Sequence, residues 1–185
     1  MKLILASGSP RRRELLTQAG FEFEVIPADI DETRHPNEPP MDYVRRLALE
    51  KAQTIATLHP EATILGADTT VVLAGEVMNK PTDPVDAERM LRLLSGLTHQ
   101  VHTGLCVITP AATHQHVETT DVVFREITED ELAHYLASGH ATDKAGAYGI
   151  QGYAARWIPR IEGDYFNVVG LPLSTVVSLL RFTGA

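Results

Sequence analysis

The sequence predicts an α/β protein built on one mixed sheet, and two observations support this. In the first half of the chain, short apolar stretches such as residues 3–6 alternate with segments whose apolar residues have helical spacing, such as residues 41–58. In the second half, two long strand-like segments, 100–109 and 116–127, flank a turn at 110–113 and favour an antiparallel hairpin. Alternating strands and helices favour parallel pairing, so the two patterns together predict a mixed sheet.

The size and composition of the chain fit one packed domain. The chain has 185 residues, of which 44% are hydrophobic, and this content is ample for a packed interior. It contains no internal repeat, low-complexity tract or clear linker. We therefore predict a single domain over residues 1–185, with two lobes that share a core as the other arrangement compatible with this length.

Charge and cysteine content argue against several classes of function. The formal net charge of −8 argues against nucleic-acid binding, which depends on the neutralisation of phosphates. No apolar run approaches the ~20 residues that span a membrane, and the apolar residues before Ser7 are too few for a signal peptide. The one cysteine, Cys106, excludes an internal disulfide and lies in a stretch typical of a buried strand. These features predict a cytoplasmic protein with neither a nucleic-acid nor a membrane partner.

The opening stretch, residues 3–16, predicts a short apolar strand, a loop of small residues and an abrupt helix start. Pro10 suits the first helical position, and Ser9 is a good N-cap just before it. A helix start presents free N–H groups and a partial positive charge, and residues 11–13 add three arginines. The stretch predicts a seat for a triphosphate or pyrophosphate, unless it is an ordinary helix start with solvated arginines. It is not a Walker A loop, because that spacing is absent.

A long loop follows at residues 27–40, where prolines and acids alternate too closely for regular structure. Its carboxylates Asp29, Asp31 and Glu32 are hard oxygen ligands of the kind that Mg²⁺ or Mn²⁺ takes. Taken alone, this stretch favours a solvated acidic loop over a metal site.

Two charged residues stand out in otherwise apolar patterns. Lys51 lies near the apolar face of the predicted helix 41–58, either as a snorkelling side chain or as a phosphate contact. Asp68 is the lone acid of an apolar strand, residues 63–73. A buried carboxylate is costly unless it is paired or bound to metal, which favours a catalytic or metal-binding role for Asp68 over a structural one.

The rest of the chain adds a polar loop and structural elements. Residues 143–152 combine three glycines with Gln151, whose amide could read the edge of a base, although a plain turn explains the glycines equally well. Residues 128–131 form a capping box that predicts a helix start. A strand hairpin is expected around 162–164 and a last helix after 170–172. The side chains predicted to lie on the surface rather than to bind metal are His99, His102, His114 and His116.

Together these features are the equipment of metal-assisted phosphoanhydride hydrolysis. In this chemistry a cation neutralises the phosphates while a carboxylate activates water. The parts are a phosphate seat, a cation-binding loop, a strand carboxylate, two lysines and a polar loop, carried by Arg11, Arg12, Glu32, Asp68, Lys51, Lys80 and Gln151.

These motifs closely resemble, in order and over nearly the whole chain, those of the Maf family of nucleoside triphosphate pyrophosphatases. The matching segments are residues 7–16, 50–52, 66–69, 80–81 and 143–152. The resemblance implies an elongated, mixed-sheet α/β structure of the Maf/inosine-triphosphatase type, with a cleft between two lobes and commonly dimeric. It implies a cytoplasmic enzyme that uses Mg²⁺ or Mn²⁺ to hydrolyse dTTP and UTP to the monophosphate and pyrophosphate.

The resemblance also implies roles for individual residues. Asp68 would accept the proton of the attacking water and, with Glu32, would hold the metal. The residues that would contact phosphates or metal-bound water are Ser7, Arg12, Lys51 and Lys80.

The choice of base would be set by Arg11, Thr69 and Gln151. This combination is similar to that of the family branch that hydrolyses dTTP and UTP. Other or modified pyrimidine triphosphates are left open as further substrates. Thr70 and Asn79 depart from the family pattern, which has apolar or small residues there. The alternative from a different class is a non-catalytic nucleotide-binding regulator of cell division. An acid like Asp68 beside a metal site favours the enzyme.

Overall fold

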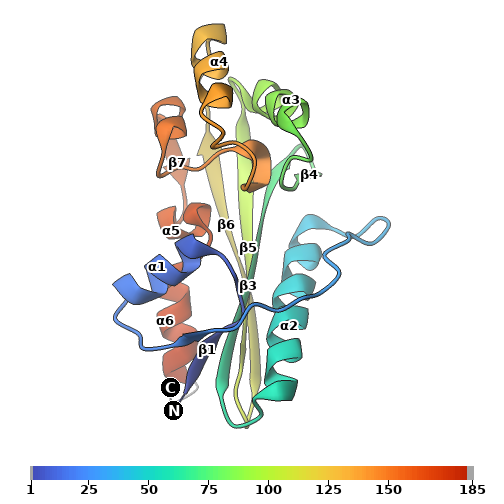
Figure 1. Cartoon of the computed structure of the whole chain (residues 1–185), viewed down its shortest axis with the longest axis vertical. Helices are drawn as coiled ribbons and strands as arrows, with labels where there is room; N and C mark the ends of the chain where they lie inside the picture. The colour runs from blue at the N-terminus through green and yellow to red at the C-terminus, as the bar shows by residue number, and fades with distance from the viewer. Residues whose placement is uncertain (1, 183–185) are drawn as a thin grey trace.

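The computed structural model describes residues 2–182, which form an elongated molecule with a long twisted sheet as its axis (Figure 1). Within these residues the sheet has seven strands in the order β2–β1–β3–β5–β6–β7, with β4 paired to β3. β1 pairs in parallel with β2 and β3, and the other pairs are antiparallel, so the predicted mixed sheet is confirmed. The strands are β1 (Leu3–Leu5), β2 (Glu24–Val25), β3 (Thr63–Leu73), β4 (Glu76–Met78), β5 (Thr98–Ile108), β6 (Thr113–Val123) and β7 (Arg160–Glu162).

The helices lie on both sides of this sheet and at one end of it (Figure 1). The α-helices are α1 (Pro10–Gln18), α2 (Pro40–Leu58), α3 (Pro84–Leu94), α4 (Glu129–Ala137), α5 (Tyr165–Val169) and α6 (Leu173–Phe182). Two short 3₁₀ segments are η1 (Ala145–Ala147) and η2 (Tyr153–Trp157). No helix in residues 2–182 combines the length and the apolar character needed to cross a membrane.

The α2 helix packs unusually close to the sheet because glycines face it. A Cβ atom added to Gly66 of β3 would lie 2.2 Å from the carbonyl oxygen of Ala48, and one added to Gly104 of β5 would lie 2.2 Å from that of Val44. Only glycine permits such an approach of two backbones. The position of α2, and of the side chains that it carries, is therefore fixed by the middle of the sheet.

The two faces of the sheet follow the alternation of side chains along the strands. Ile4 and Ile64 point to the α2 face and are fully buried there with Cys106, which confirms the predicted buried cysteine. The neighbouring side chains Leu5 and Leu65 point to the opposite face, where α1 and α6 complete a second buried cluster. Sequence alternation therefore produces two cores, one on each side of the same strands.

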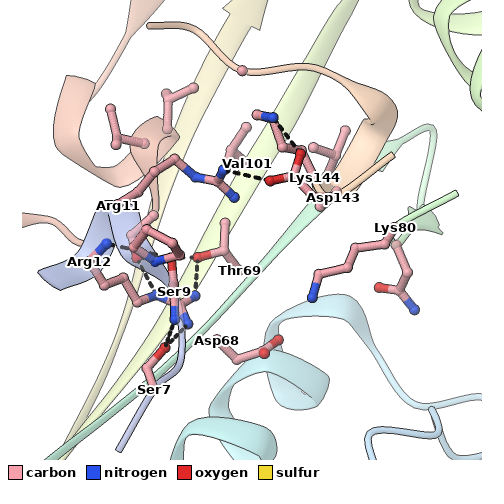
Figure 2. Close-up of a pocket in the computed structure, with 18 of the residues that line it drawn as sticks. Ser7, Ser9, Arg11, Arg12, Asp68, Thr69, Lys80, Val101, Asp143 and Lys144 are labelled. Atoms are coloured by element: carbon pink, nitrogen blue, oxygen red, sulfur yellow. Dashed lines mark hydrogen bonds and ion pairs between the residues drawn. The ribbon is translucent and has the colours of Figure 1, made fainter. Parts of the chain in front are cut away.

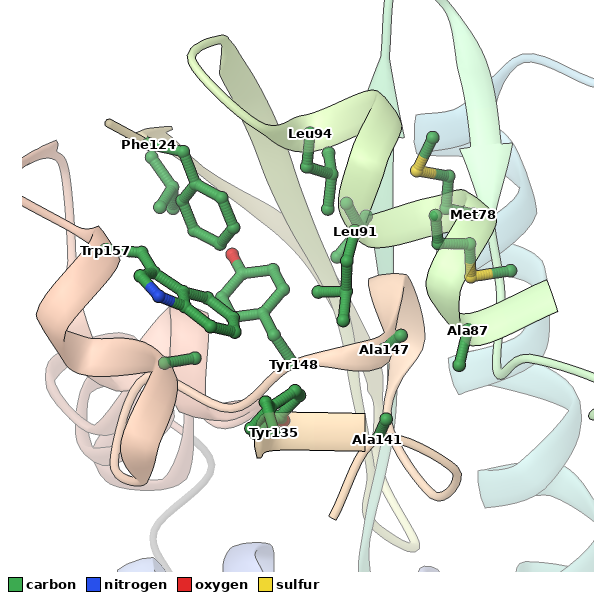
Figure 3. Close-up of a cluster of buried hydrophobic side chains, with 14 of the residues drawn as sticks. Met78, Ala87, Leu91, Leu94, Phe124, Tyr135, Ala141, Ala147, Tyr148 and Trp157 are labelled. Atoms are coloured by element: carbon green, nitrogen blue, oxygen red, sulfur yellow. The ribbon is translucent and has the colours of Figure 1, made fainter. Parts of the chain in front are cut away.

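A third cluster fills the far end of the sheet, under α3 and α4 (Figure 3). Phe124, Tyr148 and Trp157 lie in it with edge-on ring contacts. His99 is only 2% exposed, and its Nε2 lies 2.7 Å from the Tyr148 hydroxyl. His102 is also buried, so the prediction that this first pair of histidines lies on the surface is wrong. Their positions on β5 point them into packed layers rather than to solvent.

The predicted strand hairpin around residues 162–164 is also wrong. Asp164 is an N-cap whose side chain accepts a hydrogen bond from the backbone N–H of Asn167, 2.7 Å away, and so starts α5. Asn167 is fully buried and donates to the Val101 carbonyl and the Thr120 hydroxyl. These long-range bonds, which no local pattern reveals, stabilise the helix.

Smaller differences concern strand bounds. The predicted hairpin between the two long strands is confirmed, but β6 covers Thr113–Val123 rather than 116–127, because Phe124 turns into the third cluster. β2 consists only of Glu24 and Val25, which pair in parallel with Ile4 and Leu5 of β1 and form one edge of the sheet.

Candidate active site

A cavity of about 590 Å³ opens beside the middle of the sheet. It is bounded by the loop after β1, the segment between β2 and α2, the helix α2, strand β3 and the residues that follow β4 and α4. Every residue to which the family resemblance gave a role in the site lines it: Ser7, Arg11, Arg12, Glu32, Lys51, Asp68, Thr69, Lys80 and Gln151. Residues far apart in the sequence therefore meet in one cleft.

The start of α1 forms as expected, with Pro10 in the first turn and the Ser9 side chain accepting a hydrogen bond from the Arg12 backbone N–H at 3.4 Å. The Arg12 side chain then turns inward and is only 8% exposed (Figure 2). Its guanidinium donates to the carbonyl oxygens of Ala67 (2.9 Å) and Gly170 (2.8 Å) and to the hydroxyls of Ser7 (3.0 Å) and Thr69 (2.9 Å).

Through these bonds Arg12 links separate segments of the protein, and its guanidinium also places a positive charge beside the cleft. Four of the five N–H groups of the guanidinium are engaged, so at most one remains for a ligand. Burial lowers the pKa of Arg12, and the negative charge of Asp68 acts against that shift. What Arg12 offers to an anion in the cleft is therefore mainly its charge.

Lys51 joins the two predicted metal ligands. Its Nζ atom lies 2.7 Å from Oδ1 of Asp68 and 2.6 Å from Oε1 of Glu32. The Asp68 side chain is 12% exposed, whereas that of Glu32 is 53% exposed. Lys51 extends into the site rather than along the protein surface, because Gly66 lets its helix lie against β3. Two carboxylates from separate segments thus share one ammonium group.

The pKa values of the two carboxyl groups are shifted in opposite directions. Burial raises the pKa of the Asp68 carboxyl, although the charges of Lys51 and Arg12 act against this. Burial also acts to raise the pKa of Glu32, but the hydrogen bond and charge of Lys51, with the charge of Lys80, outweigh it and lower that pKa. Asp68 thereby has the character of a proton acceptor, while Glu32 stays ionised and suits a cation.

Polar side chains without protein partners face the same cleft. Lys80 extends into it from the segment after β4 (Figure 2). Within residues 2–182, its ammonium has no hydrogen-bond or ion-pair partner, and the side-chain amide of Gln151 has none either. An unpaired ammonium in a cleft favours an anionic ligand, and an unpaired amide can recognise a polar ring edge.

Arg11 connects two segments that line the cleft. Its Nη1 atom lies 3.2 Å from Oδ2 of Asp143, which belongs to the polar loop after α4. The other oxygen of Asp143 contacts Lys144. Of the basic residues 11–13, Arg11 and Arg12 face the cleft and Arg13 is exposed.

The donor set can be compared with what a divalent cation requires. Among residues 2–182 no group of three or more His, Cys, Asp or Glu side chains is arranged to hold a metal ion. Asp29 and Asp31, considered with Glu32 from the sequence, do not line the cleft. Glu32 and Asp68 do, and Mg²⁺ commonly takes one or two protein carboxylates while phosphate oxygens and water complete its shell. The residues present therefore fit a divalent cation whose remaining ligands are water molecules or phosphate oxygens.

Tyr43 and Asn79 are polar side chains of the cleft to which sequence reasoning gave no role in the site. The hydroxyl of Tyr43 donates to the Glu32 carbonyl at 2.8 Å, and the Asn79 amide donates to that hydroxyl at 3.3 Å. Thr70, the other departure from the family pattern, donates to the Asn79 side chain at 3.2 Å. The two unusual residues are thus hydrogen-bonded to each other, and their joint departure was the one signal available.

Comparison with protein families identifies the chain. The model of the Maf family, described as Maf-like protein, matches residues 2–183. The chain belongs to the Maf family. A relative from Koribacter versatilis is 50% identical over 184 residues, covering 100% of this chain and 95% of the relative. One from Vibrio parahaemolyticus is 47% identical over 182 residues, covering 98% of this chain and 96% of the relative. Both are named dTTP/UTP pyrophosphatase.

Solved structures support the fold. A HAM1 protein from Coxiella burnetii has a TM-score of 0.55 at 14% identity, covering 98% of both chains. The Staphylococcus aureus Ham1 protein has a TM-score of 0.51 at 15% identity, covering 67% of this chain and 72% of that one. The elongated mixed-sheet architecture predicted from the sequence is therefore confirmed.

Proposed function

We propose that this Maf protein hydrolyses dTTP and UTP to the nucleoside monophosphate and pyrophosphate. The observation that carries the proposal is the set of charges in the cleft: a buried carboxylate, Asp68, lies on Lys51 while the cations Lys80 and Arg12 face the same space. Such an arrangement can neutralise a polyphosphate and activate water beside it. The activity named for relatives about 50% identical, which match this chain over 95–96% of their own length, supports the same reaction.

In the proposed reaction Asp68 is the proton acceptor for the attacking water. The raised pKa of its carboxyl makes it a stronger base than an exposed aspartate, while Lys51 holds it in place by the 2.7 Å contact. Water attacks a phosphorus atom of the triphosphate, its proton passes to Asp68, and the bond from that phosphorus to the bridging oxygen of the leaving group breaks. Attack at the α-phosphorus releases pyrophosphate.

The cationic side chains bind the triphosphate. Lys80, which lacks a protein partner in the described residues, would take a phosphate oxygen directly, and Lys51 would exchange part of its contact with Glu32 for one. Ser7, at the end of the opening strand, offers a hydroxyl beside Arg12, whose own bonds leave mainly its charge for the substrate. These roles place the negative charge of the substrate among fixed positive charges.

We propose Mg²⁺ or Mn²⁺ as the cofactor, held by Glu32 and Asp68. When bound, the cation would supply charge neutralisation at the phosphates and orient the substrate. The chain itself contributes two carboxylates that already face a shared positive charge, at Lys51.

Base choice is proposed to depend on Arg11, Thr69 and Gln151. The free amide of Gln151 can pair with one donor and one acceptor on a pyrimidine edge. Arg11 lines the cleft and forms an ion pair with Asp143. The Thr69 hydroxyl is already shared with Arg12 and Thr103, so Thr69 would act through shape and through the position of Arg12.

Several properties of the whole protein are proposed with this function. We propose a single domain over residues 1–185 that works in the cytoplasm as a homodimer, with no nucleic-acid partner. The net charge of −8 and the single buried cysteine support the absence of a nucleic-acid partner and a reducing compartment, respectively. The dimer rests on family resemblance alone.

Product analysis tests the function. Purified protein is incubated with Mg²⁺ or Mn²⁺ and a panel of nucleoside triphosphates, and the products are separated by chromatography. Monophosphate and pyrophosphate from dTTP and UTP, with little product from purines, are expected. Release of diphosphate and orthophosphate would move the cleavage site and contradict the mechanism. Nucleotide binding without turnover would instead indicate the regulator.

A further inference from the structure

A chain of hydrogen bonds runs from the sheet to the segment that carries Glu32. The Thr70 hydroxyl donates to Oδ1 of Asn79 (3.2 Å), and the Asn79 amide donates to the Tyr43 hydroxyl (3.3 Å). The Tyr43 hydroxyl then donates to the backbone carbonyl of Glu32 (2.8 Å). Every group passes its hydrogen in the same direction, an arrangement in which neighbouring bonds strengthen one another.

Tyr43 is a rigid member of this chain. It is 3% exposed and packs with Val44 and Leu47 in a cluster that also receives Ile30 of the Glu32 segment. Burial raises the pKa of Tyr43, so the hydroxyl keeps its proton and remains a donor at neutral pH. The ring fixes where the hydroxyl lies, and the hydroxyl fixes the Glu32 backbone.

Asn79 connects this chain to the rest of the cleft. The next residue is Lys80, whose ammonium extends into the cavity (Figure 2). The backbone carbonyl of Asn79 accepts a hydrogen bond from the N–H of Gly146, 3.3 Å away in the polar loop after α4. Asn79 therefore lies at a junction between the Glu32 segment, Lys80 and that loop.

The segment that carries Glu32 depends on such contacts because it forms no backbone hydrogen-bond pattern of a strand or helix. Residues 26–39 are irregular and lie between β2 and α2. Arg46 secures the far end of the segment through Glu38, with Nε–Oε1 at 2.6 Å, and it also donates to the carbonyl of Thr33, the residue after Glu32, at 3.1 Å. Loss of the Tyr43 hydroxyl would thus leave the segment attached through Arg46, while the hydrogen bond to the Glu32 backbone disappears.

We propose that Tyr43 and Asn79 are positioning residues that hold the Glu32 carboxylate against Lys51 and Asp68, and so set the affinity of the cleft for a divalent cation. This rests on the part of the proposed function that assigns a metal to Glu32. Residues that hold a metal-binding carboxylate by hydrogen bonds typically change metal affinity 10–100-fold when they are altered.

The first test uses Tyr43→Phe, which keeps the packed ring and removes only the hydroxyl. Mn²⁺ is titrated into nucleotide-free protein and free Mn²⁺ is followed by electron paramagnetic resonance. Binding about 10-fold weaker than in the wild type is expected. Hydrogen exchange of the metal-free protein should become faster around Glu32. The matched control is Tyr135→Phe, which removes a hydroxyl bonded to the His140 carbonyl at 3.4 Å, in the far cluster, and should leave Mn²⁺ affinity unchanged.

The second test is a double-mutant cycle on two members of the hydrogen-bond chain, Thr70 and Asn79. Thr70→Val alone should weaken Mn²⁺ binding, because it removes the hydrogen bond to Asn79. Asn79→Ala already interrupts the hydrogen-bond chain, so adding Thr70→Val to that variant should weaken Mn²⁺ binding no further. Additive effects, or a Tyr43→Phe protein with wild-type Mn²⁺ affinity and exchange, would overturn the proposal. Wild-type protein that binds no Mn²⁺ would also overturn it.

The two proposals fail in different ways. If the wild type binds Mn²⁺ and Tyr43→Phe weakens it, but no triphosphate is cleaved, the positioning role stands and the proposed function falls. If triphosphates are cleaved and Tyr43→Phe behaves as wild type, the function stands and the positioning role falls.

Discussion

Replacing Gly66 by alanine tests whether the close packing of α2 sets the geometry of the cleft. The added Cβ would lie 2.2 Å from the Ala48 carbonyl oxygen and 2.9 Å from the Ala52 Cβ, whereas ordinary contact begins at 3.4 Å. The difference between 3.4 and 2.2 Å requires α2 to withdraw by about 1.2 Å. Lys51 lies between these two residues on the same helix, so its ammonium moves away from Asp68.

The expected effects have two parts. Overpacking should lower the free energy of unfolding by about 1–3 kcal/mol, measured by urea denaturation. A displacement of about 1 Å typically lowers catalytic efficiency about 100-fold, so kcat/KM for dTTP should fall by about that factor at a temperature where the variant is folded.

The control is Gly75→Ala in the turn between β3 and β4. Gly75 has φ +85° and no atom within 4 Å of an added Cβ, so the change costs backbone strain of about 1–2 kcal/mol without a clash. It should lower stability and leave kcat/KM unchanged. A folded Gly66→Ala protein with the catalytic efficiency of the wild type would refute the argument that this contact places Lys51.

Three further predictions concern charge and burial. Lys51→Met removes a positive charge that stabilises the Asp68 carboxylate, so the pKa of Asp68 should rise and the acid limb of the kcat/KM profile should move to higher pH; an unmoved limb would assign it to another group. Burial lowers the pKa of His99 from 6.5 to about 4, so stability present above pH 6.5 should be lost as the pH falls toward 4. The loss should be about 3 kcal/mol. In denaturation curves measured across that pH range, His99→Leu should flatten this dependence. Arg12→Lys leaves buried carbonyl acceptors unpaired and should lower the unfolding free energy by about 1–3 kcal/mol; an unchanged melting temperature would contradict this.

Local patterns predicted the elements whose causes are local. Ser9 and Pro10 start α1, and the capping box at Thr128 starts α4, because each involves groups a few residues apart. Asp68 was recognisable because a lone carboxylate in an apolar strand requires a partner, and the structure supplies Lys51. The resemblance to the family then predicted that these separate residues share one site, and the structure places them in one cleft.

The failures have causes that lie far away in the sequence. His99 is buried because Phe124 and Tyr148 pack around it, and nothing near it in the chain announces this. Residues 165–169 form a helix because Asp164 caps it and because the buried Asn167 side chain bonds to Val101 and Thr120, on the distant strands β5 and β6. In each case a buried polar group is satisfied by distant partners, which periodicity does not record.

The most direct test of the central claim compares Asp68→Asn with the wild type. Turnover of dTTP with Mg²⁺ and the affinity for a non-hydrolysable triphosphate analogue are measured on the same preparations. If Asp68 accepts the proton of the attacking water, turnover should fall about 10²–10⁴-fold while the analogue still binds. Near-wild-type turnover would contradict the assignment of Asp68 and, with it, the proposed mechanism.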